Sequence, residues 1–234
     1  MVIGILQPGY IPWLGFFEQL HRSDVFVLYD DVQYDKNGWR NRNRIKTPTG
    51  PQWLTVPVSF DFSAHPAINA VRINNQTDWR RKHLLSLRQN YSQAAFFRDY
   101  VGIFEEAYAR SWEKLVDLDL HLLRELAGAL GLGHKRVLLS SSLGIPGERV
   151  ERLINTCKHL GADTFYEGAA GRDYMHPSDF AAHGITLEFQ DYAHPTYRQL
   201  HGAFIPYLSV VDLLFNCGRD SLDILIGRKP GATI

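Results

Sequence analysis

The sequence predicts an α/β fold with a mostly parallel sheet. Two separated stretches, residues 2–29 and 135–167, predict it, because each contains an apolar run, a helical pattern and a second apolar run. Strand–helix–strand units of this kind favour parallel strands joined by a right-handed crossover. A further apolar run at residues 185–189 adds another strand.

The first unit has clear boundaries. Its first strand is the apolar run Val2 to Leu6, which Gln7-Pro8-Gly9 closes. Pro12 opens the helix, because proline suits the first helical turn. Ser23-Asp24 ends that helix before the second apolar run, Val25 to Tyr29.

The middle of the chain interrupts this alternation. Apolar residues at helical spacing predict three successive helices over residues 77–131. Before them, an alternating run from Trp53 to Phe60 carries Pro57, which is typical of an edge strand or of a strand end. Since no linker rich in Pro, Gly or Ser divides the chain, we expect one domain, residues 1–234, with a helical insert.

Composition excludes several function classes. Lys and Arg total 25 and Asp and Glu total 25, so no global field attracts nucleic acid or an anionic membrane. Cys157 and Cys217 lack metal-ligand spacing, which predicts buried thiols in a reducing compartment and no metal site. No run of eighteen apolar residues is present, so we expect a cytoplasmic protein without membrane insertion.

Polar residues follow the first two predicted strands. Gln7 and Tyr10 follow the first strand, Trp13 lies in the opening turn of the helix, and Asp30 and Asp31 follow the second strand. Ligands of open parallel sheets bind beyond the carboxyl ends of the strands. We therefore expect these loops to meet at one ligand site.

A basic segment, residues 36–44, follows shortly after Gln33. It alternates cations and amides around one tryptophan, in the order Lys36, Asn37, Gly38, Trp39, Arg40, Asn41, Arg42, Asn43, Arg44. Forked guanidinium donors suit phosphates and carboxylates, and amides suit hydroxyls. The alternative interpretation is an exposed basic hairpin without a ligand.

Three later loops also carry candidate residues. They contain Ser141 in the loop 140–144, then Gly168, Arg172 and Tyr174, and then His194, Tyr197 and Gln199. A serine-rich loop before a helix offers free N–H groups to an anion, or it simply caps the helix. We predict that the last two loops and the segments 7–12 and 30–44 converge on one cleft.

The chain resembles the WbqC-like family over nearly its whole length. The resemblance is carried by QPGYIPWLG, DDVQYDKNGWRNRNRIK, WLTVPV, GADTFYEGAAGRDYM and HPTYRQLHGAFIPYLSVVDLLFNCG. It implies a bacterial protein associated with O-antigen and other surface polysaccharides. It also implies a transferase that moves an aminoacyl group, such as glycine, onto an amino sugar.

A weaker resemblance links the strand–loop–helix layout to HIGH-type adenylyl-transferring enzymes such as pantothenate synthetase. That resemblance implies ATP as a cofactor. The histidine signature of those enzymes is absent, because residues 10–15 read Tyr-Ile-Pro-Trp-Leu-Gly and the next histidine is His21. Two sources of activated acyl group therefore stay open, namely ATP and a thioester donor on a carrier protein.

These resemblances and residues give one set of expected roles. His194 is the predicted general base, and Asp30 and Asp31 are predicted to orient the attacking amine. The substrate-binding residues are expected to hold a nucleotide-linked sugar and an acyl donor. Two alternatives remain, a non-catalytic sugar- or nucleotide-binding protein and a nucleotidyl transferase.

Overall fold

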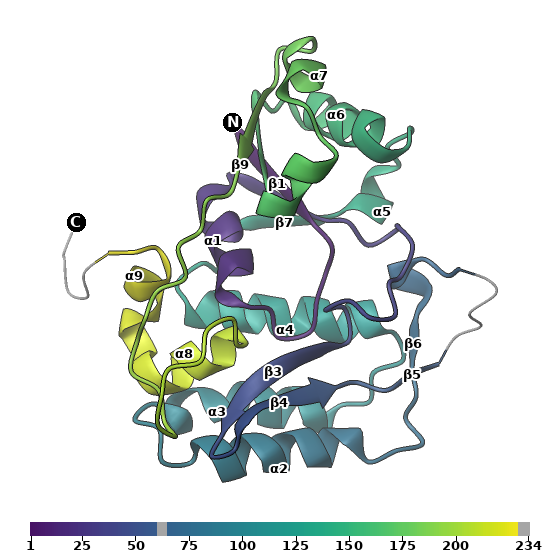
Figure 1. Ribbon diagram of the computed structural model, residues 1–234. Coiled ribbons are helices and arrows are strands. Elements are labelled where there is room, and N and C mark those ends of the chain that lie inside the picture. The colour runs from purple at the N-terminus through teal and green to yellow at the C-terminus, as the bar shows by residue number, and fades with distance from the viewer. Residues whose placement is uncertain (60–64, 229–234) are drawn as a thin grey trace.

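The structure is a computed structural model that describes residues 1–59 and 65–228. Its central sheet has five strands, all parallel, which confirms the predicted fold class (Figure 1). In spatial order the strands are β7 (Arg136–Leu139), β2 (Val25–Leu28), β1 (Val2–Leu6), β8 (Thr164–Glu167) and β9 (Thr186–Phe189).

The winding direction reverses beside β1. From β1 the chain moves outward through β2 to β7, and it then returns to β8 on the other side of β1. Gly4 accordingly lies opposite both Phe26 and Tyr166. A Cβ atom on Gly4 would lie 2.9 Å from the Phe26 ring, so the tight packing here requires glycine. The carboxyl end of β1 is thus the point where such a sheet binds ligands.

Helices cover both faces of the sheet. On one face Phe26 packs with Phe16 and Phe17 of α1 (Leu14–Arg22), and the Phe16 and Phe26 ring centroids lie 5.2 Å apart. On the other face the odd-numbered residues of β1 pack against α6 (Arg149–Leu160) and α7 (Pro177–Ala181). Alternation of side chains along each strand produces these two cores.

The predicted helical insert is present. It consists of α2 (Trp79–Tyr91), α3 (Phe97–Ala109) and α4 (Leu115–Ala129), and it packs with α8 (Val210–Cys217) and α9 (Ser221–Leu225). Leu115, Leu118, Leu122 and Leu126 form a fully buried stripe on α4. Their spacing of three and four residues is the periodicity that predicted the helix.

An antiparallel hairpin lies between the central sheet and the helices α2 and α3 (Figure 1). Its strands are β3 (Arg42–Thr47) and β4 (Gly50–Thr55), with Arg44 opposite Trp53. The predicted edge strand from Trp53 to Phe60 is divided, because β4 ends at Thr55 and a separate strand, β5 (Val58–Ser59), begins after Pro57. Phe60 lies outside the described residues.

Short elements complete the described chain. The strand β6 (Arg72–Ile73) pairs with β5. The others are the helical turn α5 (Ser140–Leu143) and the 3-10 helices η2 (Ile68–Ala70), η3 (Ala169–Asp173) and η4 (Gly218–Asp220). The serine run expected as a loop is therefore the turn α5.

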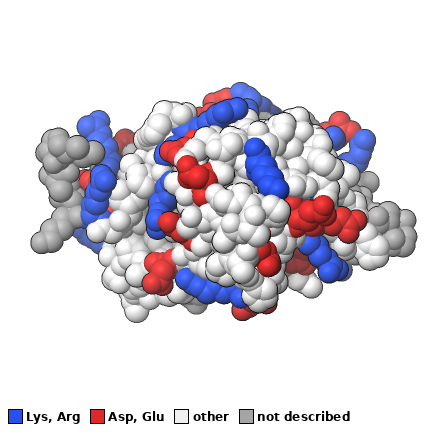
Figure 2. Space-filling model, turned by 90° about the horizontal axis from the view of Figure 1, so that it is seen from above, with Lys and Arg blue, Asp and Glu red and all other residues white. Residues whose placement is uncertain are grey.

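Over residues 1–59 and 65–228 no helix has the length and apolarity needed to span a bilayer. Cations and carboxylates are interspersed on the face seen in Figure 2.

Candidate functional site

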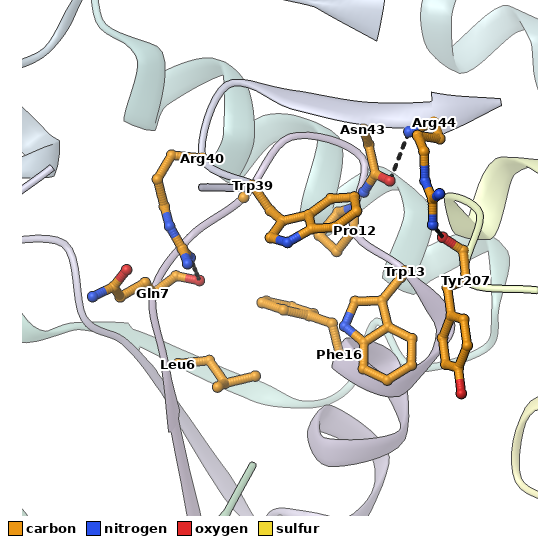
Figure 3. A pocket seen from close by; sticks show the side chains of 11 residues that line it. Leu6, Gln7, Pro12, Trp13, Phe16, Trp39, Arg40, Asn43, Arg44 and Tyr207 are labelled. Carbon is orange, nitrogen blue, oxygen red and sulfur yellow. Dashed lines mark hydrogen bonds between the residues drawn. The ribbon is translucent and has the colours of Figure 1, made fainter. Parts of the chain in front are cut away.

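A pocket of about 500 Å³ lies at the carboxyl end of β1 (Figure 3). We call it the β1 pocket. It is lined by Leu6, Gln7, Gly9, Pro12, Trp13, Phe16, Trp39, Arg40, Asn43, Arg44 and Tyr207. These residues come from the β1–α1 loop, the basic segment and the stretch before α8, and they place the pocket beside the sheet's reversal point.

Backbone contacts join the β1–α1 loop to the basic segment. The N–H of Tyr10 donates to the carbonyl oxygen of Arg40 at 3.0 Å. Asn43 Nδ2 donates to the carbonyl oxygen of Ile11 at 2.9 Å. A Cβ atom on Gly9 would lie 3.0 Å from the Trp39 carbonyl oxygen, so glycine allows this close approach. Asn43 therefore shapes the pocket through the main chain.

Two guanidinium groups border the pocket without a carboxylate partner. Arg40 Nη1 donates to the carbonyl oxygens of Gln7 and Pro8, each at 3.2 Å. Arg44 Nη2 donates to the carbonyl oxygen of Tyr207 at 3.1 Å. Within the described part of the chain, no carboxylate oxygen lies within 4.0 Å of either guanidinium. The pocket thus has positive charge available for an anion.

Aromatic rings line the pocket and lie close to Arg44. Trp39 faces Phe16 and Trp13 across the pocket (Figure 3). The Trp39 and Trp53 ring centroids are 5.0 Å apart, and the Arg44 guanidinium carbon lies 5.6 Å and 5.7 Å from them. Trp39 and Trp53 are each 43% exposed, so flat faces remain accessible to a ligand.

A buried polar cluster lies behind the pocket. The Tyr10 hydroxyl bonds to His83 Nδ1 at 2.8 Å and to the Tyr108 hydroxyl. Asp119 of α4 is 1% exposed, and neither of its carboxylate oxygens has a hydrogen-bond partner among the described residues. Burial raises the pKa of Asp119, while the charge of Arg40 acts in the opposite direction. Tyr10 thus contacts the interior, although its neighbours in the loop line the pocket.

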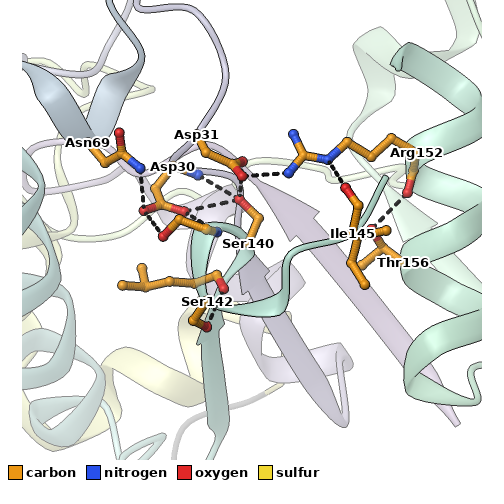
Figure 4. A network of polar contacts seen from close by, with 10 residues as sticks. Asp30, Asp31, Asn69, Ser140, Ser142, Ile145, Arg152 and Thr156 are labelled. Carbon is orange, nitrogen blue, oxygen red and sulfur yellow. Dashed lines mark hydrogen bonds and ion pairs between the residues drawn. The ribbon is translucent and has the colours of Figure 1, made fainter. Parts of the chain in front are cut away.

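The predicted pair Asp30 and Asp31 lies in a separate network (Figure 4). The Asp30 carboxylate accepts from Ser141 Oγ at 2.7 Å, from the Ser141 N–H at 2.9 Å and from Asn69 Nδ2 at 3.3 Å. Asp31 pairs with Arg152 and accepts from Ser140 Oγ at 2.6 Å. These contacts fasten the end of β2 to α5 and α6.

The same network uses the donors expected to bind an anion. The N–H and hydroxyl of Ser141 both point to Asp30, so α5 presents these groups to an internal carboxylate. Burial acts to raise the pKa of Asp31, but hydrogen bonds from Arg152 and Ser140 outweigh it and lower that pKa. Neither aspartate lines the β1 pocket.

His194 lies next to the pocket through Tyr207. Its Nδ1 donates to the carbonyl oxygen of Pro195 at 2.9 Å, and its Nε2 accepts from the Tyr207 N–H at 3.1 Å. Burial lowers the pKa of His194 and favours this neutral form. Because both nitrogens are engaged, the imidazole has no lone pair free for a substrate proton.

The remaining residues of that loop are also held internally. Gln199 Oε1 accepts from Lys46 Nζ at 3.0 Å and from the Ile205 N–H at 2.9 Å. Tyr197 is 8% exposed and packs against His194 and Phe204. This loop therefore positions Tyr207, a pocket residue that the sequence pattern did not single out.

The other candidate residues lie in three places. Arg172 Nη1 donates to the Gln190 carbonyl oxygen at 3.3 Å, and exposed Tyr174 follows it at the end of η3, which Gly168 precedes. Gln33 Nε2 contacts His65 Nδ1 at 3.1 Å. A second pocket is lined in part by Lys36, Asn41 and Arg42. The β1 pocket thus collects only part of the predicted set, namely Gln7, Trp13, Trp39, Arg40, Asn43 and Arg44.

Glu167 is a second residue that the sequence pattern did not single out. It is the last residue of β8, the strand beside β1, and only 7% of its surface is exposed. Burial raises the pKa of Glu167 to about 7, although the backbone N–H of Gly168 donates to it. The sequence feature that could have identified Glu167 is an acidic residue at the end of an apolar strand.

Metal-ligating side chains do not gather in the described part of the chain. No group of three or more His, Cys, Asp or Glu residues there could hold a metal ion. Both cysteines are free, with Cys157 buried. Burial raises the pKa of Cys157 to about 12, so its thiol stays protonated at neutral pH.

Fold and site define an α/β protein with a cationic, aromatic pocket at the reversal point of a parallel sheet. The chain belongs to the WbqC-like protein family, whose model matches residues 7–224. It is 37% identical over 225 residues to the uncharacterized protein Rv1507c of Mycobacterium tuberculosis, covering 95% of this chain and 96% of that protein. No solved structure matches the chain.

Proposed function

We propose that this protein forms an amide by transferring an acyl group, such as a glycyl group, to the amine of a nucleotide-linked amino sugar. Surface polysaccharide biosynthesis in the cytoplasm is the corresponding role. One observation supports the proposal: the β1 pocket combines the rings of Trp13 and Trp39 with the guanidinium groups of Arg40 and Arg44, which have no carboxylate partner among the described residues. Phosphates suit the guanidinium groups, and a base or sugar suits the rings.

In the proposed reaction the amine nitrogen attacks the acyl carbon. The new C–N bond forms as the bond from the acyl carbon to its leaving group breaks, and the leaving group keeps the electron pair. A base removes the extra proton from nitrogen. We propose Glu167 for that step, because it ends β8, the strand paired with β1, and because a pKa of about 7 suits a base at neutral pH. His194 could serve only after releasing the Tyr207 N–H.

The energy source decides between two versions of this function. We expect the amide product either from glycine and ATP, with release of AMP or ADP, or from a glycyl thioester without ATP. Incubating the protein with an amino-sugar nucleotide and each donor, followed by mass spectrometry, distinguishes them. Absence of product with both donors would contradict the transferase assignment.

One specific observation favours a second candidate, a non-catalytic nucleotide-sugar-binding protein. Asp30, Asp31 and His194, the three residues predicted to be catalytic, are all engaged in internal hydrogen bonds. Such a protein would bind the nucleotide sugar with the same arginines, and its affinity would stay unchanged on Glu167→Gln substitution. Turnover that depends on Glu167 is therefore the discriminating result.

A further inference from the structure

A second, smaller pocket adjoins the β1 pocket. Its volume is about 250 Å³, and its lining includes Tyr34, Lys36, Asn37, Asn41, Arg42 and Thr55. We call it the Arg42 pocket. The basic segment forms the wall between the two pockets, because Trp39 and Arg40 line the β1 pocket while Asn41 and Arg42 line the Arg42 pocket.

Arg42 gives this pocket a fixed positive charge. Its guanidinium carbon lies 4.7 Å from the Trp53 ring centroid, and Nη2 donates to the carbonyl oxygen of Asn37. Throughout residues 1–59 and 65–228, no carboxylate oxygen lies within 4.0 Å of this guanidinium. The stacked ring and the carbonyl bond hold the guanidinium in one place.

The lining chemistry matches that charge. Among the residues that the structure describes, no acid lines the Arg42 pocket, and Asn37, Asn41 and Thr55 supply neutral polar groups. Asn41 is held in place because its Nδ2 donates to the Val56 carbonyl oxygen at 2.8 Å. A fixed guanidinium beside neutral polar groups recognises a phosphate or carboxylate group. The pocket has half the volume of the β1 pocket, which suits a small group rather than a nucleotide sugar.

Trp53 connects the two linings. Its ring contacts Arg42 of the one pocket and Arg44 of the other, at 4.7 Å and 5.7 Å from the guanidinium carbons. The Trp39 ring, which lines the β1 pocket, lies 5.0 Å from the Trp53 ring. A molecule anchored at Arg42 thus has a continuous aromatic and cationic surface leading to the β1 pocket.

We propose that the Arg42 pocket binds the anionic group, phosphate or carboxylate, of the second substrate, the acyl donor. This inference rests on the proposed function, because it assigns the two pockets to the two reactants. The acceptor nucleotide sugar occupies the β1 pocket and the donor's anion is held at Arg42. The two ligands then bind at the same time.

Calorimetric titration of the full chain with inorganic phosphate and, separately, with acetate tests the proposal. We expect saturable binding of at least one anion, with affinity reduced tenfold or more by Arg42→Gln. The control Arg98→Gln removes an exposed cation of α3 that lines neither pocket, and we expect it to leave the affinity unchanged. Phosphate and acetate together indicate which anionic group the donor carries.

A second titration uses protein saturated with uridine diphosphate. We expect the anion to bind this complex with nearly the same affinity, since the two sites are separate. Competition between the ligands, equal affinity in wild type and Arg42→Gln, or no saturable anion binding would each overturn the proposal. Anion binding at Arg42 in a protein that forms no amide would contradict the proposed function alone.

Discussion

Arg44 Nη2 donates a hydrogen bond to the carbonyl oxygen of Tyr207 at 3.1 Å, although 163 positions separate the two residues in sequence. The Ser209 N–H donates to the Arg44 carbonyl oxygen at 2.9 Å and reinforces this contact. His194 holds the N–H of the same tyrosine from the other side. The β1 pocket is therefore closed by a stretch of chain that follows the last strand of the sheet.

The first prediction concerns Arg44. We expect Arg44→Gln to weaken binding of uridine diphosphate by roughly 1.5–3 kcal/mol, because a charged hydrogen bond to phosphate is lost. Calorimetry measures the affinity, and Arg98→Gln is the matched control. Unchanged affinity, or an equal loss in both variants, would contradict a phosphate-binding role for Arg44.

The second prediction concerns Asp30. We expect Asp30→Asn to lower the free energy of unfolding by about 1–3 kcal/mol, because Ser141 and Asn69 lose a charged acceptor. Urea denaturation measures this change, and nucleotide affinity should stay the same. The opposite pattern, with stability unchanged and turnover lost, would assign Asp30 to catalysis.

The third prediction concerns pH. Burial lowers the pKa of His83 from 6.5 to about 4, so the unfolded chain binds this proton more readily than the folded protein does. Protonation of His83 therefore does not affect the free energy of unfolding above pH 6.5. As pH falls from 6.5 toward 4, the unfolded chain takes up this proton and the free energy of unfolding decreases by roughly 3 kcal/mol. We expect His83→Gln to show a weaker pH dependence of unfolding than wild type over this range. Parallel pH profiles would show that His83 does not cause the effect.

The fourth prediction concerns Glu167. If it accepts the amine proton, turnover should rise with pH through an apparent pKa of about 7, and Glu167→Gln should remove most of this turnover. Binding of uridine diphosphate by the variant serves as the control for folding. A variant with wild-type turnover and the same pH profile would exclude Glu167 as the base.

The sequence predicted the sheet and the helical insert because their signals are local. Apolar runs mark the strands, and leucines three and four residues apart mark α4. Pro57 left two interpretations open, an edge strand or a strand end, because the alternation of the flanking residues continues across it. Local pattern alone did not show where β4 ends and β5 begins.

The site was predicted only in part, for a physical reason. Gln7 and Arg40 line one pocket because the carboxyl end of a parallel strand gathers the loops beside it. Asp30 and Gln199 have residue types that bind ligands, yet Asp30 accepts a hydrogen bond from Ser141 and Gln199 accepts one from Lys46. Such partners are distant in sequence, so no local pattern reveals them.

A comparison of two acceptors tests whether the protein forms an amide on a nucleotide-linked amino sugar. One acceptor carries the amine and the other carries a hydroxyl at the same carbon, each supplied with both glycine plus ATP and a glycyl thioester. Mass spectrometry should show the acylated nucleotide sugar from the amine alone. If both acceptors bind but the amine yields no product with either donor, the account of this protein as an amide-forming transferase is contradicted.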